Sequence, residues 1–541
     1  MARSEALRCT GGASALSEGP YTGAMERGAA LSAMRSVVGD AWVERDDVVL
    51  RRLAVNTLGV ERSLAAAVRP ASLDEVRGCL RAASLHGAPV YPVSRGRNWG
   101  LGSRAPVVDS CVLLDLGRMD AITDYDEAMG TVTVEPGVSF AALYEFLRER
   151  GSPWFVPVTG SSPEASVLGN ALERGDGVGV DGDRASRVCD LEAVLSTGEV
   201  LRTGFSRFEG ARAAGAHRWG VGPSLDGLLT QSNLAVVTRA TLWLSRLPRS
   251  IHALRFAVKT TDALGPLVDA LRSLRAEGTL RSTAALWNAL RVRSTVARYP
   301  YAAAGGAVPL PESLREDVVR ELGGCAWHGL TGIYAADEAI GAALRERAVA
   351  VLGPVVESWS AEERAGDARS GHELLWETEP AFGSLQGVPH EESLRSAYWR
   401  MRDAPERGLD LDRDGCGVIW LCPVVPWRGE DVVRVTAMAE AAMPAAGFEA
   451  MLAVVSQSER SAYAVPSIFF DRGVEGEAER AMAAHDGMLR AMVAEGYLPY
   501  RLGVHSMGAL PPSRDDTDVV LRRIKAAMDP AGVVAPGRYE R

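Results

Sequence analysis

The sequence predicts an α+β protein made of two parts, and three observations support this fold class. Segments with strand and helix patterns alternate from about residue 64 to residue 245. A second series of alternating strands and Ala-rich helices runs from residue 246 to about 495. Between residues 151 and 185 the chain is rich in Gly and Ser, and a stretch of this length inside a compact domain is either functional or disordered.

These patterns divide the chain into four segments. Residues 1–40 are rich in Gly, Ala and Ser with little periodicity, which indicates a flexible N-terminal extension. Residues 41–245 form the first domain, residues 246–495 the second, and residues 496–541 a C-terminal segment. The 541 residues are enough to bury a large core in each domain.

Clear start and stop signals mark the first elements of the first domain. The apolar run 65–68 is followed by Arg69-Pro70, which is typical of a strand that ends just before a proline. Ser72 and Glu75 form a capping box, so a helix is expected from there to Gly87, where glycine ends it. Further strands are expected at 89–93, 111–116, 130–134 and 235–244, with a helix at 139–150 and a hairpin over 191–202.

In the second domain the clearest helices are expected near residues 262–277, 335–351 and 430–446, and the C-terminal segment carries one near 515–528. Two acidic groups stand out. A charged insert at 401–416 contains Asp410, Asp412 and Asp414. The cluster Glu373, Glu377 and Glu379 is typical of a solvated face, the alternative being contact with a cationic substrate.

The net charge and the spacing of the cysteines limit the classes of function that this protein can have. Lys and Arg number 59 against 69 Asp and Glu, so the net charge of −10 gives no basic surface for nucleic acid. The seven cysteines are irregularly spaced without a C-x-x-C pair, which predicts no disulfide framework and no metal site, and fits a reducing cytoplasm. No apolar run reaches the ~18 residues of a membrane span, and the N-terminus lacks the apolar stretch of a signal peptide. We therefore expect a cytoplasmic protein that binds small molecules.

The loop that follows the strand at 89–93 is the first candidate binding motif. Glycines let a backbone approach a ligand closely, and consecutive N–H groups can converge on a phosphate oxygen. The alternative is an ordinary surface turn, since the spacing is neither a P-loop nor a Rossmann motif. The candidate residues are Ser94, Arg95, Gly96, Arg97, Asn98, Trp99 and Leu101.

Three further motifs follow in order along the chain. The segment 166–175, Ser-Val-Leu-Gly-Asn-Ala-Leu-Glu-Arg-Gly, combines small side chains with an Asn, which suits a flat ring against the backbone. The segment 222–228 reads Gly-Pro-Ser-Leu-Asp-Gly-Leu, and the segment 529–538 runs from Asp-Pro to Ala-Pro-Gly-Arg. Each motif alone is compatible with a structural loop.

Taken together in this order, the motifs resemble those of the vanillyl-alcohol oxidase / p-cresol methylhydroxylase flavoprotein family over roughly residues 60–541. The resemblance implies FAD as the cofactor, a PCMH-type FAD-binding domain in two parts (residues 41–245 and 496–541), and a substrate (cap) domain, residues 246–495, with a large antiparallel sheet. It implies that the loop from Ser94 to Leu101 holds the pyrophosphate. The flavin would be lined by Thr159, Gly160, Ser161, Ser162, Ser166, Gly169, Asn170, Gly175, Val178 and Arg501.

The resemblance also implies where the substrate binds. Family members hold a phenolate with two Tyr and one Arg, and Tyr500-Arg501 matches one such pair, where Arg501 could stabilise an oxyanion or reduced flavin. Two other family Tyr positions are Leu101 and Val178 here, and a family Asp is Ser161. With this partial clamp we expect a substrate larger or less acidic than a simple p-alkylphenol.

His505, four residues after Arg501, is a candidate general base, the alternative being a hydrogen-bonded core histidine. Covalent flavin attachment is not expected. The His used by some members falls near Val418, and the Tyr used by others falls at Ala397, next to Tyr398. We expect non-covalent FAD, with Tyr398 as the residue to test.

These features predict an FAD-dependent oxidoreductase that takes hydride from a C–H bond next to an oxygen, a nitrogen or an aromatic ring. O2 is favoured over a protein as electron acceptor, and the family suggests a homodimer. The reaction is expected to be a tailoring step on a secondary metabolite. Two alternatives are a dehydrogenase of a sugar or hydroxy acid, and a redox-silent binding protein with the same fold.

Overall fold

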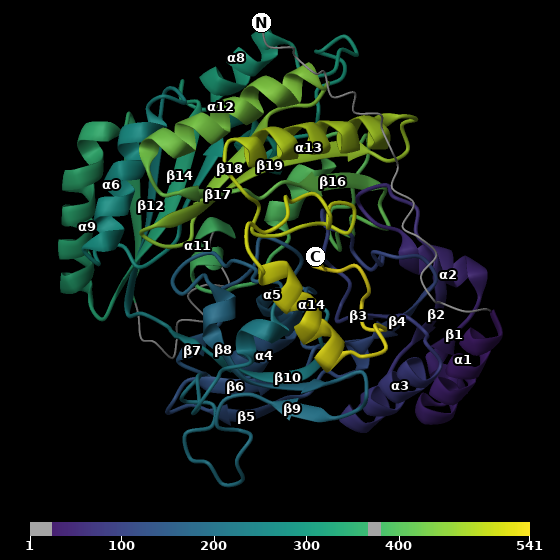
Figure 1. The fold of residues 1–541 in the computed structure, drawn as a ribbon. Coiled ribbons are helices and arrows are strands. Elements are labelled where there is room, and N and C mark those ends of the chain that lie inside the picture. Colours follow the sequence, from purple (N-terminus) through teal and green to yellow (C-terminus); the bar gives the residue numbers. More distant parts are fainter. Residues whose placement is uncertain (1–23, 366–379, 541) are drawn as a thin grey trace, which may run out of the picture.

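The computed structural model describes residues 24–365 and 380–540, which form two lobes with a cavity between them. The acidic residues Glu373, Glu377 and Glu379 lie outside the described residues, as do residues 1–23 of the expected extension. Figure 1 shows the large sheet of the cap and its helices above the smaller sheets of the first lobe. The predicted α+β fold class is confirmed.

The first lobe contains two sheets. In the four-stranded sheet the order is β1-β2-β4-β3, and β2, β4 and β3 run parallel. Its elements are α1 (Ala24–Val38), β1 (Val43–Glu44), α2 (Asp47–Ala54), β2 (Leu64–Val68), α3 (Leu73–Leu85), β3 (Val90–Val93) and β4 (Cys111–Asp115). The predicted capping box begins α3: Ser72 Oγ accepts from the N–H of Glu75 at 3.2 Å, and a Glu75 carboxylate oxygen accepts from the N–H of Ala71 at 2.8 Å.

The five-stranded sheet of the first lobe is antiparallel, in the order β5-β6-β10-β8-β9. Its elements are β5 (Ile122–Asp126), β6 (Thr131–Val134), α4 (Phe140–Glu149), α5 (Val167–Leu172), β8 (Val188–Val194), β9 (Val200–Arg202) and β10 (Val236–Trp243). A short pair, β7 (Trp154–Phe155) with β11 (Ser245–Arg246), connects this lobe to the cap. β11 extends to Arg246, one residue beyond the expected end of the first domain at residue 245.

Residues 24–38 differ from the expected flexible extension. They form α1, which packs on α3, and Leu31, Met34 and Val38 are buried in the core of the four-stranded sheet. The reason is the spacing of these apolar residues: positions three to four apart lie on one face of a helix.

The cap is built on an antiparallel sheet of eight strands. Seven follow the order β15-β12-β14-β13-β18-β19-β16, and β17 pairs with β19. The strands are β12 (Ser250–Val258), β13 (Ala284–Asn288), β14 (Trp327–Ala335), β15 (Ser358–Ala365), β16 (Cys416–Trp420), β17 (Val424–Pro426), β18 (Met451–Ser456) and β19 (Ser461–Asp471). The helices are α6 (Leu264–Ala276), α7 (Ala289–Val296), α8 (Glu312–Glu321), α9 (Glu338–Leu352), α11 (Pro380–Leu385), α12 (Gly429–Ala445) and α13 (Glu477–Ala494).

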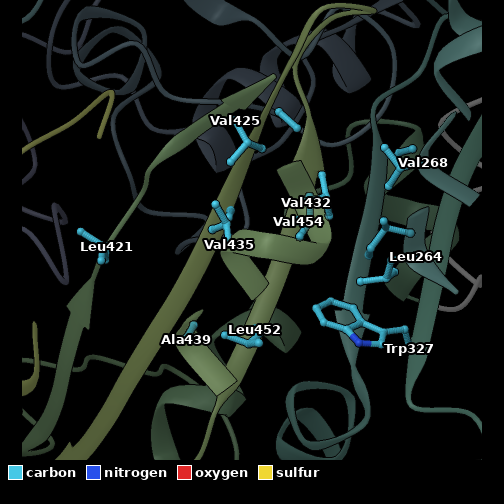
Figure 2. Packing of buried hydrophobic residues seen from close by; sticks show 14 of the residues in the cluster. Leu264, Val268, Trp327, Leu421, Val425, Val432, Val435, Ala439, Leu452 and Val454 are labelled. Carbon is cyan, nitrogen blue, oxygen red and sulfur yellow. The ribbon is translucent and has the colours of Figure 1, made fainter. Parts of the chain in front are cut away.

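The two faces of the cap sheet have different functions. Helices α6, α9, α12 and α13 cover one face and enclose the largest apolar core, part of which Figure 2 shows. On β18, Leu452 and Val454 point into this core, whereas Ala453 and Val455 line the cavity on the other face. Successive side chains of a strand point to opposite faces, so the packing of one face presents the other to the cavity.

The C-terminal segment returns to the first lobe after α14 (Thr517–Met528) (Figure 1). Its last residues extend the four-stranded sheet, because the N–H of Val90 donates to the carbonyl of Val533 and the N–H of Ala535 donates to the carbonyl of Val90, each at 2.8 Å. No helix in the described part of the chain is long and apolar enough to cross a membrane.

Candidate active site

A cavity of about 470 Å³ lies between the two lobes. Its walls come from the glycine loop after β3, the Gly/Ser-rich stretch, the inner face of the cap sheet and the C-terminal segment. It brings together most of the predicted site residues: Ser94, Gly96, Arg97, Asn98, Trp99, Leu101, Thr159, Gly160, Ser161, Ser166, Gly169, Asn170, Gly175, Val178, Tyr500 and Arg501.

Three predicted residues are not part of this lining. The guanidinium of Arg95 is paired with Glu164 and donates to its carbonyl at 3.0 Å. Ser162 accepts from the N–H of Glu164. His505 is buried against His485, with 4.5 Å between the ring centroids, and burial followed by repulsion from His485 lowers the pKa of His505 to about 3. His505 is therefore a neutral, buried side chain outside the cavity lining and does not face a ligand there.

The glycine loop presents backbone donors to the cavity. Within the described residues, the N–H groups of Gly96, Arg97 and Asn98 donate to no protein acceptor. Gly100 has a φ of +77°, and a Cβ there would lie 1.8 Å from Trp420 on β16 of the cap. Only glycine allows both this backbone conformation and this close approach. The loop can therefore offer its N–H groups to an anion while lying tightly against the cap.

The charged insert of the cap fixes the same loop. Asp410 pairs with Arg97, and Asp412 accepts from the indole N–H of Trp99 at 3.0 Å and from the Ser103 hydroxyl at 2.8 Å. The charge of Arg97 is thus already compensated by protein. The backbone N–H groups, rather than this side chain, are the free donors of the loop.

A buried ion pair connects the C-terminal segment to the Gly/Ser-rich stretch. Arg538 contacts Glu173 at 2.5 Å and donates to the hydroxyl of Tyr91 at 2.7 Å. Burial opposes ionisation of Glu173, but Arg538 and Arg501 more than offset it, so its pKa is lowered. Gln231 then donates to the carbonyls of Glu173 and Tyr500, at 3.2 and 2.8 Å. Gln231 of the first lobe thereby fixes the backbone at Tyr500 relative to Glu173.

Tyr500 and Arg501 form a polar corner of the cavity. The Tyr500 ring stacks on Tyr463 with 4.1 Å between centroids, and the Arg501 guanidinium lies 5.2 Å from the Tyr500 ring. The Nε of Arg501 is buried with no hydrogen-bond partner among the described residues. Burial raises the pKa of Tyr500, which keeps its hydroxyl a donor at neutral pH. The corner offers a cation and a neutral donor to an oxygen anion.

Asp176 also lines the cavity. Its carboxylate oxygens are buried, and no side chain in the described part of the chain donates a hydrogen bond to them. Burial raises the pKa of Asp176 to about 6, an effect that Arg184 partly offsets. Arg184 itself is occupied, donating to Asn170 at 2.7 Å and to the Pro157 carbonyl at 2.8 Å. Asp176 is thus a carboxylate whose protonation changes near physiological pH.

The remaining wall is apolar and aromatic. The cavity face of the cap sheet carries Trp287, Trp420, Ala285, Val455 and Val465. Aromatic and branched side chains of this kind suit a flat, largely apolar ligand.

Sequence reasoning did not include several lining residues in the site: Tyr91, Glu173, Asp176, Gln231, Trp287, Arg291, Trp420 and Arg538. Glu173 and Arg538 lie inside motifs that had been recognised, and Asp176 directly follows Gly175. For Glu173, Asp176 and Arg538, the feature of the sequence that could have indicated a binding role is a charged residue inside or next to a Gly-containing motif. Nothing in the local sequence marks Trp287 or Arg291. No group of three or more metal-ligating side chains occurs in the described ranges.

The cavity fits an FAD molecule. Its lining includes Tyr91 on β3 and Ala535 of the C-terminal segment as well as Trp287 and Val455 on the cap sheet. The unpartnered N–H groups of the glycine loop suit a pyrophosphate. At Gly169 a Cβ would lie 2.4 Å from the Ser94 hydroxyl, so small residues keep the backbone close to the site.

Comparisons with known proteins agree with this geometry. Residues 64–204 match the FAD binding domain family. The chain is 40% identical over 527 residues to 1'-carboxy-chondrochloren decarboxylase of Chondromyces crocatus, covering 94% of this chain and 97% of the relative. It is 28% identical to the flavoprotein subunit of 4-cresol dehydrogenase (hydroxylating) of Pseudomonas putida, covering 94% of each. The crystal structure of p-cresol methylhydroxylase with bound substrate superposes with a TM-score of 0.86 at 25% identity, over 96% of this chain and 97% of that one.

Fold, cavity and comparisons define an enzyme of the FAD-linked oxidoreductase class. Within that class the chain belongs to the vanillyl-alcohol oxidase / p-cresol methylhydroxylase flavoprotein family, as the motifs predicted.

Proposed function

We propose that this enzyme oxidises a phenolic small molecule of secondary metabolism at the carbon next to the aromatic ring, and that the substrate carries a carboxyl group lost as CO2. The observation that carries this proposal is the polar corner of Tyr500 and Arg501 at one side of an aromatic-walled cavity. The names of two relatives support the chemistry: one is a decarboxylase of a carboxylated metabolite, and the other a dehydrogenase of 4-cresol.

Bound FAD supplies a two-electron acceptor for hydride. When a benzylic carbon of a 4-hydroxyphenyl substrate loses hydride, the carbon becomes electron-poor. A carboxylate on the neighbouring carbon can then leave as CO2, and its C–C bonding pair forms the C=C double bond. The substrate anion thus loses one hydride and one CO2 and becomes a neutral vinylphenol, so atoms and charge balance.

The chain's own residues have separate roles in this proposal. Arg501 and Tyr500 hold the phenol oxygen and stabilise negative charge on it, an effect strengthened where water is excluded. Asp176 accepts the phenolic proton as hydride leaves and returns it to the product oxygen, so that the vinylphenol is released neutral. The aromatic wall of Trp287 and Trp420 orients the ring.

We further propose that FAD is held without a covalent bond and that O2 reoxidises it. Tyr398 is not part of the cavity lining, and its hydroxyl donates to Asp414 at 2.6 Å. A cytoplasmic location fits the six described cysteines, which are all buried free thiols.

One preparation of the purified protein tests these points. We expect a yellow protein whose colour stays in the supernatant after acid precipitation. Under anaerobic conditions, 3-(4-hydroxyphenyl)propanoate or N-acetyl-L-tyrosine is expected to bleach the visible flavin band with release of CO2, and admitting air should restore it. Bleaching by D-lactate but by neither phenol would instead support the hydroxy-acid alternative, and a colourless protein that takes up no FAD would support the redox-silent one.

The carboxyl of Asp176 gives a pH prediction. Because its pKa is raised to about 6, the group accepts a proton only above that pH, so kcat/KM is expected to fall as the pH drops through about 6. Asp176→Asn should abolish this fall in kcat/KM at acidic pH, and it should lower kcat/KM at pH 8 by about 100-fold. It should also raise Tm at pH 8 but not at pH 4, since a raised folded-state pKa stabilises the fold only at low pH. If kcat/KM of the variant still falls as the pH drops through about 6, Asp176 is not the base.

A further inference from the structure

Arg291 is a buried cation that has no anionic partner among the residues the structure describes. It lies in the first turn of α7 and lines the cavity, and its Nε and Nη1 atoms are buried with no hydrogen-bond partner in the described ranges. Its side chain has no salt bridge there either, and its nearest aromatic contact is the ring of Phe469, 5.2 Å from the guanidinium carbon. Burial alone lowers the pKa of Arg291 to about 10, so the group remains charged at neutral pH.

The helix N-terminus and the apolar part of the cavity lining both raise the free energy of burying the charge of Arg291. Positive charge is unfavourable near a helix N-terminus, where the backbone N–H groups already carry partial positive charge. The backbone of Arg291 is nevertheless fixed there, because its N–H donates to Asn288 at 3.1 Å and Asn288 in turn binds the backbone of β18. The lining of the same cavity includes the apolar groups of Trp287 and Val455. A buried, unpaired cation in such a wall is strongly destabilising unless an anion joins it.

No other charged group of the cavity compensates Arg291. Neighbouring charges shift the pKa values of Asp176, Tyr500 and Arg501, whereas none contributes to that of Arg291. The guanidinium of Arg291 and the corner at Tyr500 and Arg501 are thus two separate polar groups of the cavity lining. The planar fork of a guanidinium matches the two oxygens of a carboxylate.

We propose that Arg291 binds the carboxylate of the substrate and selects a phenol with a carboxylate-bearing side chain. This inference rests on the proposed function for the identity of the ring, but it concerns recognition and not turnover. A bidentate pair with Arg291 would supply the anion that this position lacks. It would also hold the side chain at one end while Tyr500 and Arg501 hold the phenol oxygen at the other.

The test compares two ligands of equal size on the holoenzyme. The holoenzyme is first reduced with dithionite under anaerobic conditions so that neither ligand is turned over, and calorimetry then measures the Kd of 3-(4-hydroxyphenyl)propanoate and of its uncharged amide. We expect the acid to bind about 10- to 100-fold more tightly than the amide, as hydrogen bonds between charged groups allow. Arg291→Met should abolish this preference and leave the Kd of the amide nearly unchanged, while Arg291→Lys should retain part of it.

Arg293 provides the matched control. It lies two residues along α7, is 40% exposed and is paired with Glu321 at 3.3 Å, so Arg293→Met should keep the preference. Equal affinity of the wild type for acid and amide would overturn the proposal. So would a preference that survives Arg291→Met, or a variant that loses FAD while its acid-to-amide ratio is unchanged. If the acid preference depends on Arg291 but no phenol bleaches the flavin, the proposed function fails and this inference stands.

Discussion

Replacing Arg501 by Met is expected to lower kcat/KM for a phenolic substrate by about 10²- to 10³-fold, the usual effect of removing one preorganised donor from a developing oxyanion. The structure explains why no neighbour can take its place. Arg501 is buried, its Nε has no protein partner within the described residues, and Tyr500 beside it offers only a neutral hydroxyl. Steady-state kinetics at saturating O2 measures the effect.

Three comparisons separate this role from a structural one. Arg501→Lys keeps the positive charge but lacks the planar guanidinium with its two parallel N–H donors. It should therefore recover part of the activity that Arg501→Met loses. Because Arg501 is also expected to line the flavin, kcat/KM of Arg501→Met is expressed per bound FAD, and the Tm of the variant should stay close to that of the wild type. Arg434→Ala, which removes an exposed residue paired with Glu495, should leave kcat/KM unchanged. If Arg501→Met retains wild-type kcat/KM, the phenol oxygen is not held at this corner.

Replacing Glu449 by Ala is expected to destabilise the cap by about 3–5 kcal/mol, because it leaves a buried guanidinium without its principal partner. Arg400 is 1% exposed and contacts Glu449 at 2.9 Å and Glu477 at 3.5 Å. Glu449 also accepts from the N–H of Leu310 at 3.1 Å and the indole N–H of Trp399 at 3.2 Å. Denaturant unfolding followed by tryptophan fluorescence measures the change.

The control for this prediction is a solvent-exposed ion pair on the protein surface. The Arg434–Glu495 pair is exposed, with 60% and 43% of the side chains accessible, and such pairs contribute about 0–1 kcal/mol. Arg434→Ala should therefore shift the unfolding midpoint far less than Glu449→Ala. Glu449→Gln, which keeps an acceptor oxygen, should fall between them. Equal midpoints for Glu449→Ala and wild type would contradict a stabilising role for the buried pair.

Local patterns predicted the first lobe well because its signals are short-range. The capping box at Ser72 and Glu75 begins α3 as expected, and the hairpin expected over 191–202 is present as β8 and β9. The strands of the cap sheet were not individually predicted. On β12, buried residues occupy nearly every position, so the alternation that marks a half-exposed strand is absent.

For this protein, the sequence by itself determined the fold class, the glycine loop, the Gly/Ser-rich stretch beside the cavity and the family, because each depends on residue types at fixed local spacing. The tertiary structure alone decided which charges meet across the cavity. It brings Asp410 and Asp412 of the cap to the glycine loop, Arg538 of the tail to Glu173, and Arg291 to the cavity wall, where none of the described residues pairs with its charge. Such pairings join segments far apart in the chain, and their strength depends on burial, which only the packed structure sets.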